Sequence, residues 1–332
     1  MTHRLQRRKL VGASVALALL ASVRAFAKPG KPMPRIALVF GIPPAADIAG
    51  PDPVNANARA VIHQLRDLGW VDGRNVVIER RTAAGRGPAH LAALIEEVVA
   101  LRVDAIVTSG TGVPSARNAT NRIPIVGLID DPVDAGLIES LSRPGGNLTG
   151  TGAVGMTGKE MQMLKEIVPS ISRVAVIAGS AAPATGKGYH AGMDAAARGL
   201  GLKLEWHGVR EPRDFDEVFA AIARQGVDAL VATANQVNLA NRRRIAEFAL
   251  ANRLPSTGFA DAGSLLSYGY DIVEAHRRLA TYVAKILEGS IPSTLPWMQP
   301  TRYALTINLR TAAALRLAIP SSVLLRAEEV IR

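Results

Sequence analysis

Three pairs of similar segments occur in the same order in the two halves of the sequence. The pairs are Arg35–Val39 with Arg173–Ile177, Val103–Val107 with Val227–Val231, and Asn121–Pro124 with Asn252–Pro255. Such a repeat predicts two lobes built on the same plan. Two similar lobes imply a cleft between them, and we expect the functional site to lie in that cleft.

Short apolar segments alternate along the chain with segments of helical periodicity, which is typical of parallel α/β structure. For example, the apolar segment Ile36–Phe40 is followed by apolar residues at helical spacing between Val54 and Leu68. The predicted strands are continuously apolar, as expected where helices cover both faces of a sheet. The sequence therefore predicts an α/β protein with two similar parallel-sheet lobes.

The predicted elements after residue 262 do not fit a simple end-to-end duplication. We interpret them as the chain returning to the first lobe and then crossing back, which would make a multi-strand hinge. The predicted lobes are residues 34–148 with about 270–290, and residues 149–265 with about 300–332. The predicted crossovers lie near residues 148–152, 262–270 and 289–304.

Residues 1–27 have the layout of a secretory signal peptide. Arg7-Arg8-Lys9 is followed by the apolar segment Leu10–Val23, and Ala25-Phe26-Ala27 predicts cleavage after Ala27. The paired arginines also fit a twin-arginine export signal. An uncleaved membrane anchor remains open as an alternative.

The remainder of the chain is only mildly basic. Five of the basic residues lie in residues 1–27, which contain no acid, so +6 of the formal charge of +11 remains. Aromatic residues make up 4% of the sequence, and no basic run is interleaved with them, which argues against nucleic-acid binding. Because the chain has no cysteine, an exported protein of this sequence depends on core packing rather than disulfides.

Ligands of open parallel sheets bind beyond the carboxyl ends of the strands, and small or polar residues follow several predicted strands here. The candidate ligand-binding residues are Ser109, Gly110, Thr111, Asp130, Asp131, Ser180, Asn235, Gln236, Asp261 and Tyr268. Most of these suit hydrogen bonds to a small polar solute. Tyr268, close to a predicted crossover, is the candidate for stacking on the ligand.

Two of these segments have alternative interpretations. Ser109–Gly112 leads into a predicted helix, whose free N–H groups favour a carboxylate or phosphate; an ordinary turn with a Ser/Thr cap is the alternative. Asp130 and Asp131 are candidates for an acid/base pair, for ammonium binding, or for turn formation. The sequence contains no Gly-x-Ser-x-Gly elbow and no metal-ligand spacing of histidines. We therefore predict a binding protein without catalytic residues, metal or cofactor.

The most specific stretch of the sequence begins with Asp131-Pro132-Val133 and continues through Gly136-Leu137 to Leu141–Gly150. Together with Leu68–Val76, Gln299–Leu309 and Ile319–Ile331, it resembles the family of bacterial ABC-transporter substrate-binding proteins. The better understood members of that family take up aromatic amino acids. The resemblance covers essentially the whole chain after residue 27.

The resemblance implies a type I periplasmic-binding fold with three crossovers that closes around a solute. It also implies export to the periplasm, no reaction, a monomer, and delivery to an ABC permease and its ATPase. Carried over by position, the first-lobe contacts are Ser109, Gly110, Thr111 and Asp131. The alternatives left open are a ligand-sensing subunit of a membrane receptor and an exported two-lobed enzyme.

The second lobe departs from the family pattern at two places. Gly179-Ser180 stands where many relatives have Asn, and Asn235-Gln236 stands near a frequently acidic position. An amino-acid ligand needs a carboxylate for its ammonium group, so this loss weakens the case for amino acids. The resulting hypothesis is a small polar or carboxylate-bearing solute, either an amino acid or an organic acid.

Overall fold

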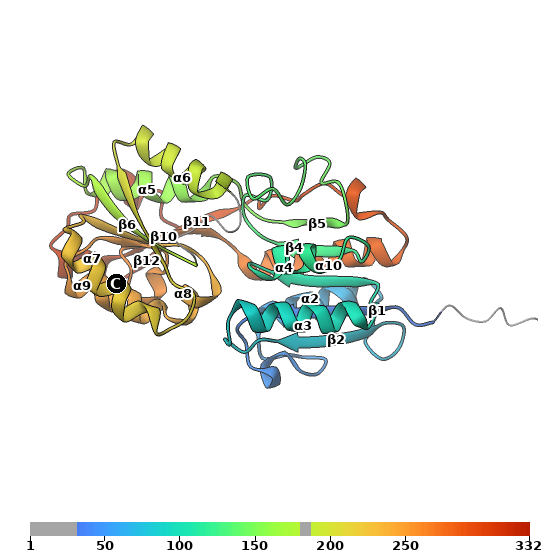
Figure 1. Ribbon diagram of the computed structural model, residues 1–332. Coiled ribbons are helices and arrows are strands. Elements are labelled where there is room, and N and C mark those ends of the chain that lie inside the picture. The colour runs from blue at the N-terminus through green and yellow to red at the C-terminus, as the bar shows by residue number, and fades with distance from the viewer. Residues whose placement is uncertain (1–31, 180–186) are drawn as a thin grey trace, which may run out of the picture. The chain divides into compact units, whose positions relative to one another are not determined.

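The computed structural model describes residues 32–179 and 187–332, so the predicted signal peptide and Ser180 lie outside the described residues. Two sheets organise these residues (Figure 1). The predicted α/β class with two parallel-sheet lobes is confirmed. One feature was not predicted: the second sheet contains an antiparallel pair of strands.

The first sheet is parallel, with the strand order β2-β1-β3-β4-β5. Its strands are β1 (Arg35–Phe40), β2 (Val77–Thr82), β3 (Ala105–Ser109), β4 (Ile125–Leu128) and β5 (Leu148–Thr151). Helices α2 (Ala56–Asp67) and α10 (Ile272–Leu287) cover one face, and helices α3 (Pro88–Ala100) and α4 (Gly112–Ala119) cover the other. Burial on both faces explains why the inner strands β1, β3 and β4 are almost entirely apolar.

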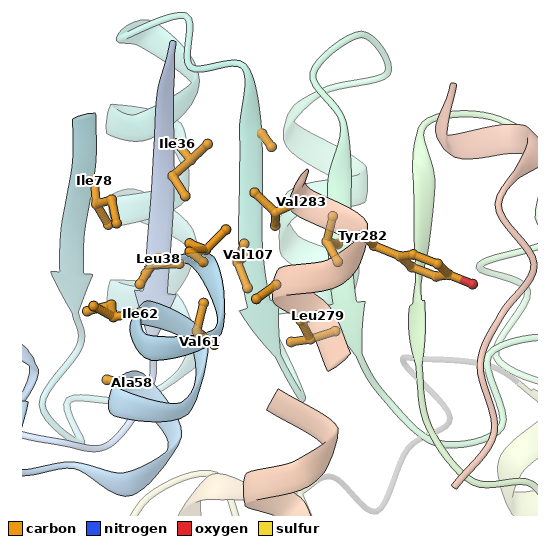
Figure 2. Close-up of a cluster of buried hydrophobic side chains, with 14 of the residues drawn as sticks. Ile36, Leu38, Ala58, Val61, Ile62, Ile78, Val107, Leu279, Tyr282 and Val283 are labelled. Carbon is orange, nitrogen blue, oxygen red and sulfur yellow. The ribbon is translucent and has the colours of Figure 1, made fainter. Parts of the chain in front are cut away.

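Helix α10 comes from the second half of the chain but packs in the core of the first sheet. Its Leu279 and Val283 belong to the same buried cluster as Val61 and Ile62 of α2, and the cluster includes the strand residues Leu38 and Val107 (Figure 2). Asp271 caps the helix by accepting hydrogen bonds from the N–H groups of Val273 and Glu274, at 2.8 and 3.0 Å.

The second sheet has the order β12-β11-β10-β9-β8-β6-β7, and β11 runs antiparallel to β10. Its strands are β6 (Arg173–Ala178), β7 (Lys203–Gly208), β8 (Ala229–Ala232), β9 (Ser256–Thr257), β10 (Leu266–Tyr270), β11 (Tyr303–Asn308) and β12 (Glu329–Ile331). Helices α5 (Met156–Ile167), α6 (Lys187–Gly199), α11 (Leu309–Leu315) and α12 (Ser321–Leu324) pack in one core of this sheet. Helices α7 (Asp214–Gln225) and α9 (Arg242–Ala251) pack in the other, and the short helix α8 (Gln236–Ala240) precedes α9. The 3₁₀ helices are η1 (Ala45–Ile48), η2 (Ala260–Ala262) and η3 (Pro292–Thr294).

The described chain passes between the two sheets three times. The first passage, residues 152–155, joins β5 to α5; the second, Asp271, joins β10 to α10; the third, residues 298–302, leads into β11. The first begins with a close approach, because a Cβ atom on Gly152 would lie 1.9 Å from the carbonyl oxygen of Ile129. Only glycine fits there. The lobe boundaries given by the sequence analysis stay a prediction.

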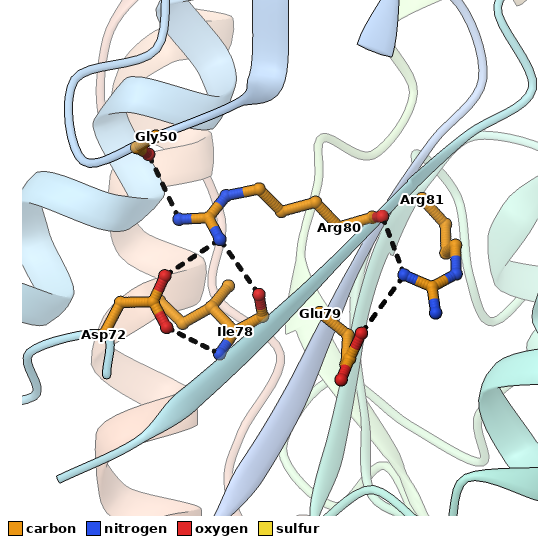
Figure 3. Close-up of polar contacts among 6 residues, drawn as sticks. All are labelled: Gly50, Asp72, Ile78, Glu79, Arg80 and Arg81. Atoms are coloured by element: carbon orange, nitrogen blue, oxygen red, sulfur yellow. Dashed lines mark hydrogen bonds and ion pairs between the residues drawn. The ribbon is translucent and has the colours of Figure 1, made fainter. Parts of the chain in front are cut away.

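Strand β2 forms an edge of the first sheet and is rich in charge. Arg80 donates hydrogen bonds to Asp72 Oδ2, at 2.9 Å, and to the carbonyl oxygen of Gly50, at 3.1 Å (Figure 3). Asp72 Oδ1 also accepts a hydrogen bond from the N–H of Ile78, and Arg81 pairs with Glu79 on the same strand. Charged side chains on an edge strand disfavour pairing with a second chain.

Candidate functional site

Each sheet has a point at which the strand order reverses, and ligands of open α/β sheets bind beyond the strand ends at such points. In the first sheet β1 lies between β2 and β3, and in the second β6 lies between β7 and β8. Ser109 ends β3, and Asn235 follows β8. Ser109 and Asn235 therefore lie at or close to these reversal points, whereas Tyr268 lies in β10, away from them.

Thr111 precedes α4 but does not cap it. Its backbone is helical, with φ −64° and ψ −16°, and its side chain makes no capping hydrogen bond. Oγ1 is buried and has no hydrogen-bond partner. Because leaving a buried hydroxyl unpaired costs about 1–3 kcal/mol, such an atom calls for an explanation. The alternative of a turn capped by a Ser/Thr hydroxyl is therefore wrong for Thr111, because its hydroxyl forms no cap.

The backbone around Thr111 is tightly constrained. Gly110 has a φ of +57°, and a Cβ atom on Gly112 would lie 2.1 Å from Thr108 Oγ1. Within residues 32–179 and 187–332, the N–H groups of Thr111 and Gly112 have no acceptor. The start of α4 thus presents a hydroxyl and two N–H groups, a donor set that suits a carboxylate.

Asp130 and Asp131 follow the neighbouring strand. Ser109 pairs with Leu128 in the parallel ladder, so the ends of β3 and β4 are adjacent. Asp130 Oδ1 accepts hydrogen bonds from the N–H of Ala153, at 2.7 Å, and from Tyr270 Oη, at 2.8 Å. Asp131 Oδ1 accepts one from the N–H of Gly155, at 2.8 Å.

The two aspartates make separate contacts and share no hydrogen bond. Burial raises the pKa of each carboxyl, and a backbone hydrogen bond partly offsets that effect. Asp131 also has a left-handed backbone, with a φ of +50°, which is uncommon outside glycine. The geometry gives no support to an acid/base pair.

Glu160 of α5 is a polar group that the sequence analysis missed. It accepts hydrogen bonds from the N–H of Tyr268, at 3.1 Å, and from Thr257 Oγ1, at 3.3 Å. Part of the side chain remains accessible, yet desolvation of its carboxyl raises the pKa to about 7, with a smaller contribution from the charge of Asp130. No sequence signal marks Glu160, because its partners lie on strands about 100 residues further along the chain.

Three tyrosines gather beside these carboxyls. The rings of Tyr268 and Tyr303 stack at 5.7 Å, and Tyr270 meets Tyr303 edge-on at 6.3 Å. The Lys159 ammonium lies 5.9 and 5.6 Å from the ring centres of Tyr268 and Tyr303. Tyr268, the predicted stacking residue, therefore already packs on another ring, and Tyr303 was not predicted.

The candidates of the second sheet are only partly described. Asn235 caps α8 by accepting from the N–H of Asn238 at 2.9 Å, and its amide donates to Thr233. Gly179 adjoins it, because a Cβ atom there would lie 3.7 Å from the Asn235 side chain. Gln236 begins α8, but its side chain is outside the described part of the structure, as is Ser180.

Asp261, unlike Thr111 and Asp130, lies on the surface of the protein. It lies in η2, and its side chain is 71% exposed. One carboxylate oxygen is 3.5 Å from Nε of Arg242, so it forms a surface ion pair. The structure places it next to a surface arginine, and no contact joins it to Thr111 or Asp131.

Two surface pockets lie near the junction of α8 and α9. One, of about 340 Å³, is lined by Asn241, Glu247 and the arginines at 242–244; the other, of about 240 Å³, is lined by residues that include Arg86 and Arg210. None of the ten candidate residues lines either pocket. We place the candidate site at the strand ends, because the unpaired donors lie there.

Two further properties concern the described residues only. Among residues 32–179 and 187–332, no cluster of three His, Cys, Asp or Glu side chains is arranged to hold a metal ion. In the same part of the chain, no helix combines the length and apolar character needed to cross a membrane.

Comparisons with known proteins match this chain to one family. A family model described as ABC transporter substrate binding protein matches residues 48–331. A tyrosine-binding protein of Clostridioides difficile is 24% identical over 265 residues, which cover 77% of this chain and 75% of that protein.

Solved structures show the same fold. A conserved domain protein of Vibrio cholerae has a TM-score of 0.78 at 25% identity, with 90% of this chain and 99% of that chain covered. An ABC domain from Streptococcus pneumoniae in complex with L-Trp has a TM-score of 0.77 at 20% identity, with the same coverage.

Proposed function

We propose that this chain, which belongs to the family of ABC transporter substrate-binding proteins, captures a small carboxylate-bearing solute, with amino acids as the favoured class. The observation that carries this proposal is the buried Thr111 hydroxyl without a partner at the start of α4. A solute carboxylate would accept hydrogen bonds from that hydroxyl and from the N–H groups of Thr111 and Gly112. The positive end of the α4 dipole adds to this attraction.

The opposite charge of an amino acid has a partner in the same region. Asp131 uses one carboxylate oxygen for Gly155, which leaves the second for a ligand ammonium group. Ser109, the last residue of β3, and Gly110 complete the proposed contacts of the first lobe. The tyrosine-binding relative and the neighbour solved with L-Trp support the choice of amino acids.

The second lobe contributes fewer charges in this proposal. Gly179 lies close to Asn235, since a Cβ atom there would be 3.7 Å from its side chain, and that side chain is committed to capping α8. Ser180, Gln236, Asp261 and Tyr268 stay predictions as ligand contacts. The proposed solute is therefore recognised chiefly through its carboxylate and ammonium groups on the first lobe.

We further propose that the protein is exported and delivers its solute to a membrane permease and its ATPase. No reaction takes place in this scheme. Solute binding favours a closed form, and it does so only to the extent that the solute binds that form more tightly than the open one. The signal-peptide layout of residues 1–27 supports export.

A thermal-shift screen of the purified protein against amino acids, organic acids and neutral sugars tests this function. Solute at about 100 times its dissociation constant adds about 2.7 kcal/mol of stability. We expect a rise of a few degrees in Tm for one or more amino acids. Stabilisation by neutral sugars alone would contradict the proposal.

A further inference from the structure

One carboxylate oxygen joins two of the three passages between the sheets. Asp130 Oδ1 accepts from the N–H of Ala153, in the first passage, and from Tyr270 Oη, at the start of the second. Tyr270 is the last residue of β10 and lies two residues before α10. These contacts link the end of β4 to segments that lead into and out of the second sheet.

The third passage meets the same group of residues. The ring of Tyr303, which begins β11, packs edge-on against Tyr270 at 6.3 Å. Met298 exchanges backbone hydrogen bonds with Gly150 and Gly152, at 2.9 and 3.2 Å, and its carbonyl oxygen also accepts from Thr151 Oγ1. Tyr270 therefore meets the first passage through Asp130, adjoins the second, and packs against Tyr303, the residue that follows the third.

Asp130 also fixes the residue that follows it. The N–H of Asp131 donates to the carbonyl oxygen of Ala153, at 2.9 Å, while the N–H of Ala153 donates to Asp130. This pair of contacts holds Asp131 in its left-handed backbone, at a φ of +50°. A residue other than glycine keeps such a backbone only where its surroundings enforce it.

We propose that Tyr270 is a positioning residue for solute binding: through the Asp130 carboxylate it holds Asp131 in the orientation that meets the solute, and neither Tyr270 nor Asp130 touches the solute. This inference rests on the function proposed above. It replaces the predicted ligand contact of Asp130 with a role in the hinge. Tyr270 was not a candidate in the sequence analysis.

Asp130→Asn separates this role from direct contact with a cationic group. Both hydrogen bonds of Asp130 end on Oδ1, and the amide oxygen of asparagine, which has two lone pairs, can accept both of them. The second carboxylate oxygen takes part in neither bond. A positioning residue therefore tolerates Asn, whereas a residue that pairs with a solute ammonium group does not.

The experiment measures solute affinity by calorimetry for wild type, Tyr270→Phe, Asp130→Asn and Asp130→Ala. Tyr282→Phe is the matched control, because it also removes one tyrosine hydroxyl, which donates to the carbonyl oxygen of Pro296 away from Asp130. We expect about tenfold weaker binding for Tyr270→Phe and Asp130→Ala, and affinity within about threefold of wild type for Asp130→Asn and Tyr282→Phe. Wild-type affinity in Tyr270→Phe, or equal losses in Asp130→Asn and Asp130→Ala, would overturn the inference.

Hydrogen–deuterium exchange without solute gives a second readout that is independent of the proposed function. Loss of the Tyr270 hydroxyl leaves Asp130 less restrained, so the amides of Asp131, Ala153 and Gly155 are expected to exchange about tenfold faster in Tyr270→Phe than in Tyr282→Phe. Unchanged exchange at these amides would overturn the inference even if the solute still binds. Faster exchange in a protein that binds no amino acid would leave the inference standing and contradict only the proposed function.

Discussion

The carboxyl group of Glu160 accepts a hydrogen bond from the backbone N–H of Tyr268, at 3.1 Å, and thereby fastens α5 to β10. Two residues further along β10, Tyr270 donates its hydroxyl hydrogen to Asp130. Carboxyl groups from two different parts of the chain thus hold the strand from which the second passage leaves. Because the pKa of each carboxyl is raised, the stability of this region depends on pH.

Glu160→Gln tests that dependence. The pKa of Glu160 is about 7 in the folded protein and 4.5 ordinarily, so between these values the folded state holds a proton that the unfolded state has lost. Protonation of Glu160 therefore stabilises the folded state fully below pH 4.5, and this contribution to the free energy of unfolding is lost as the pH rises through about 7. The glutamine variant resembles the protonated acid at every pH. At pH 8 it should be more stable than wild type, by at most about 3 kcal/mol.

Urea denaturation of both proteins at pH 5, 6, 7 and 8 measures this effect. The advantage of Glu160→Gln should grow with pH and be small at pH 5. A difference that stays constant across the range would mean that Glu160 titrates normally.

Thr111→Val should separate binding from stability. Valine has nearly the shape of threonine and removes a buried hydroxyl that has no partner, so the solute-free protein should gain about 1 kcal/mol of stability. The solute loses a donor, and its affinity should fall about tenfold. Thermal denaturation without solute and calorimetry with solute measure the two effects.

Thr108→Val is the control for this substitution. Thr108 Oγ1 donates to the carbonyl oxygen of Val39, at 3.0 Å, so its removal should cost about 1 kcal/mol and change affinity far less. If Thr111→Val bound solute as tightly as wild type, the start of α4 would not be the carboxylate site.

Gly152→Ala should damage the first passage. The added methyl group would lie 1.9 Å from the carbonyl oxygen of Ile129, and the nearest atoms are backbone atoms of Ile129 and Asp130, which cannot rotate out of the way. We expect a loss of about 3 kcal/mol, measured as a lower urea midpoint. Gly269→Ala is the matched change in β10, where a Cβ atom meets nothing within 4 Å, and it should be neutral or stabilising. Equal effects of the two substitutions would show that close approach at Gly152 is unimportant.

The sequence carried enough information to predict the two sheets. Apart from Asp104 and Asp228, the matched segments Val103–Val107 and Val227–Val231 are buried and apolar, and burial on both faces leaves a pattern that can be read locally. No local sequence pattern predicts that β11 runs antiparallel to β10. This direction follows from the third passage, whose course depends on where α10 has packed.

The candidate site was predictable only as a set of strand ends. Nothing in Ser109–Gly112 distinguishes a capping hydroxyl from an unpaired one, because the difference lies in the backbone angles of Thr111. Glu160 has the sequence surroundings of an ordinary helix residue, and only the return of β10 buries its carboxyl. Roles that arise from contacts between distant segments were the part that sequence reasoning missed.

The most direct test of the central claim compares an amino acid that binds with the same molecule lacking its carboxylate. Tryptophan and tryptamine, or tyrosine and tyramine, form such pairs, and isothermal titration calorimetry measures both affinities. If the start of α4 binds the carboxylate, the amine should bind at least about 100-fold more weakly, because a charged group loses several hydrogen bonds. Equal affinities for acid and amine would contradict carboxylate recognition.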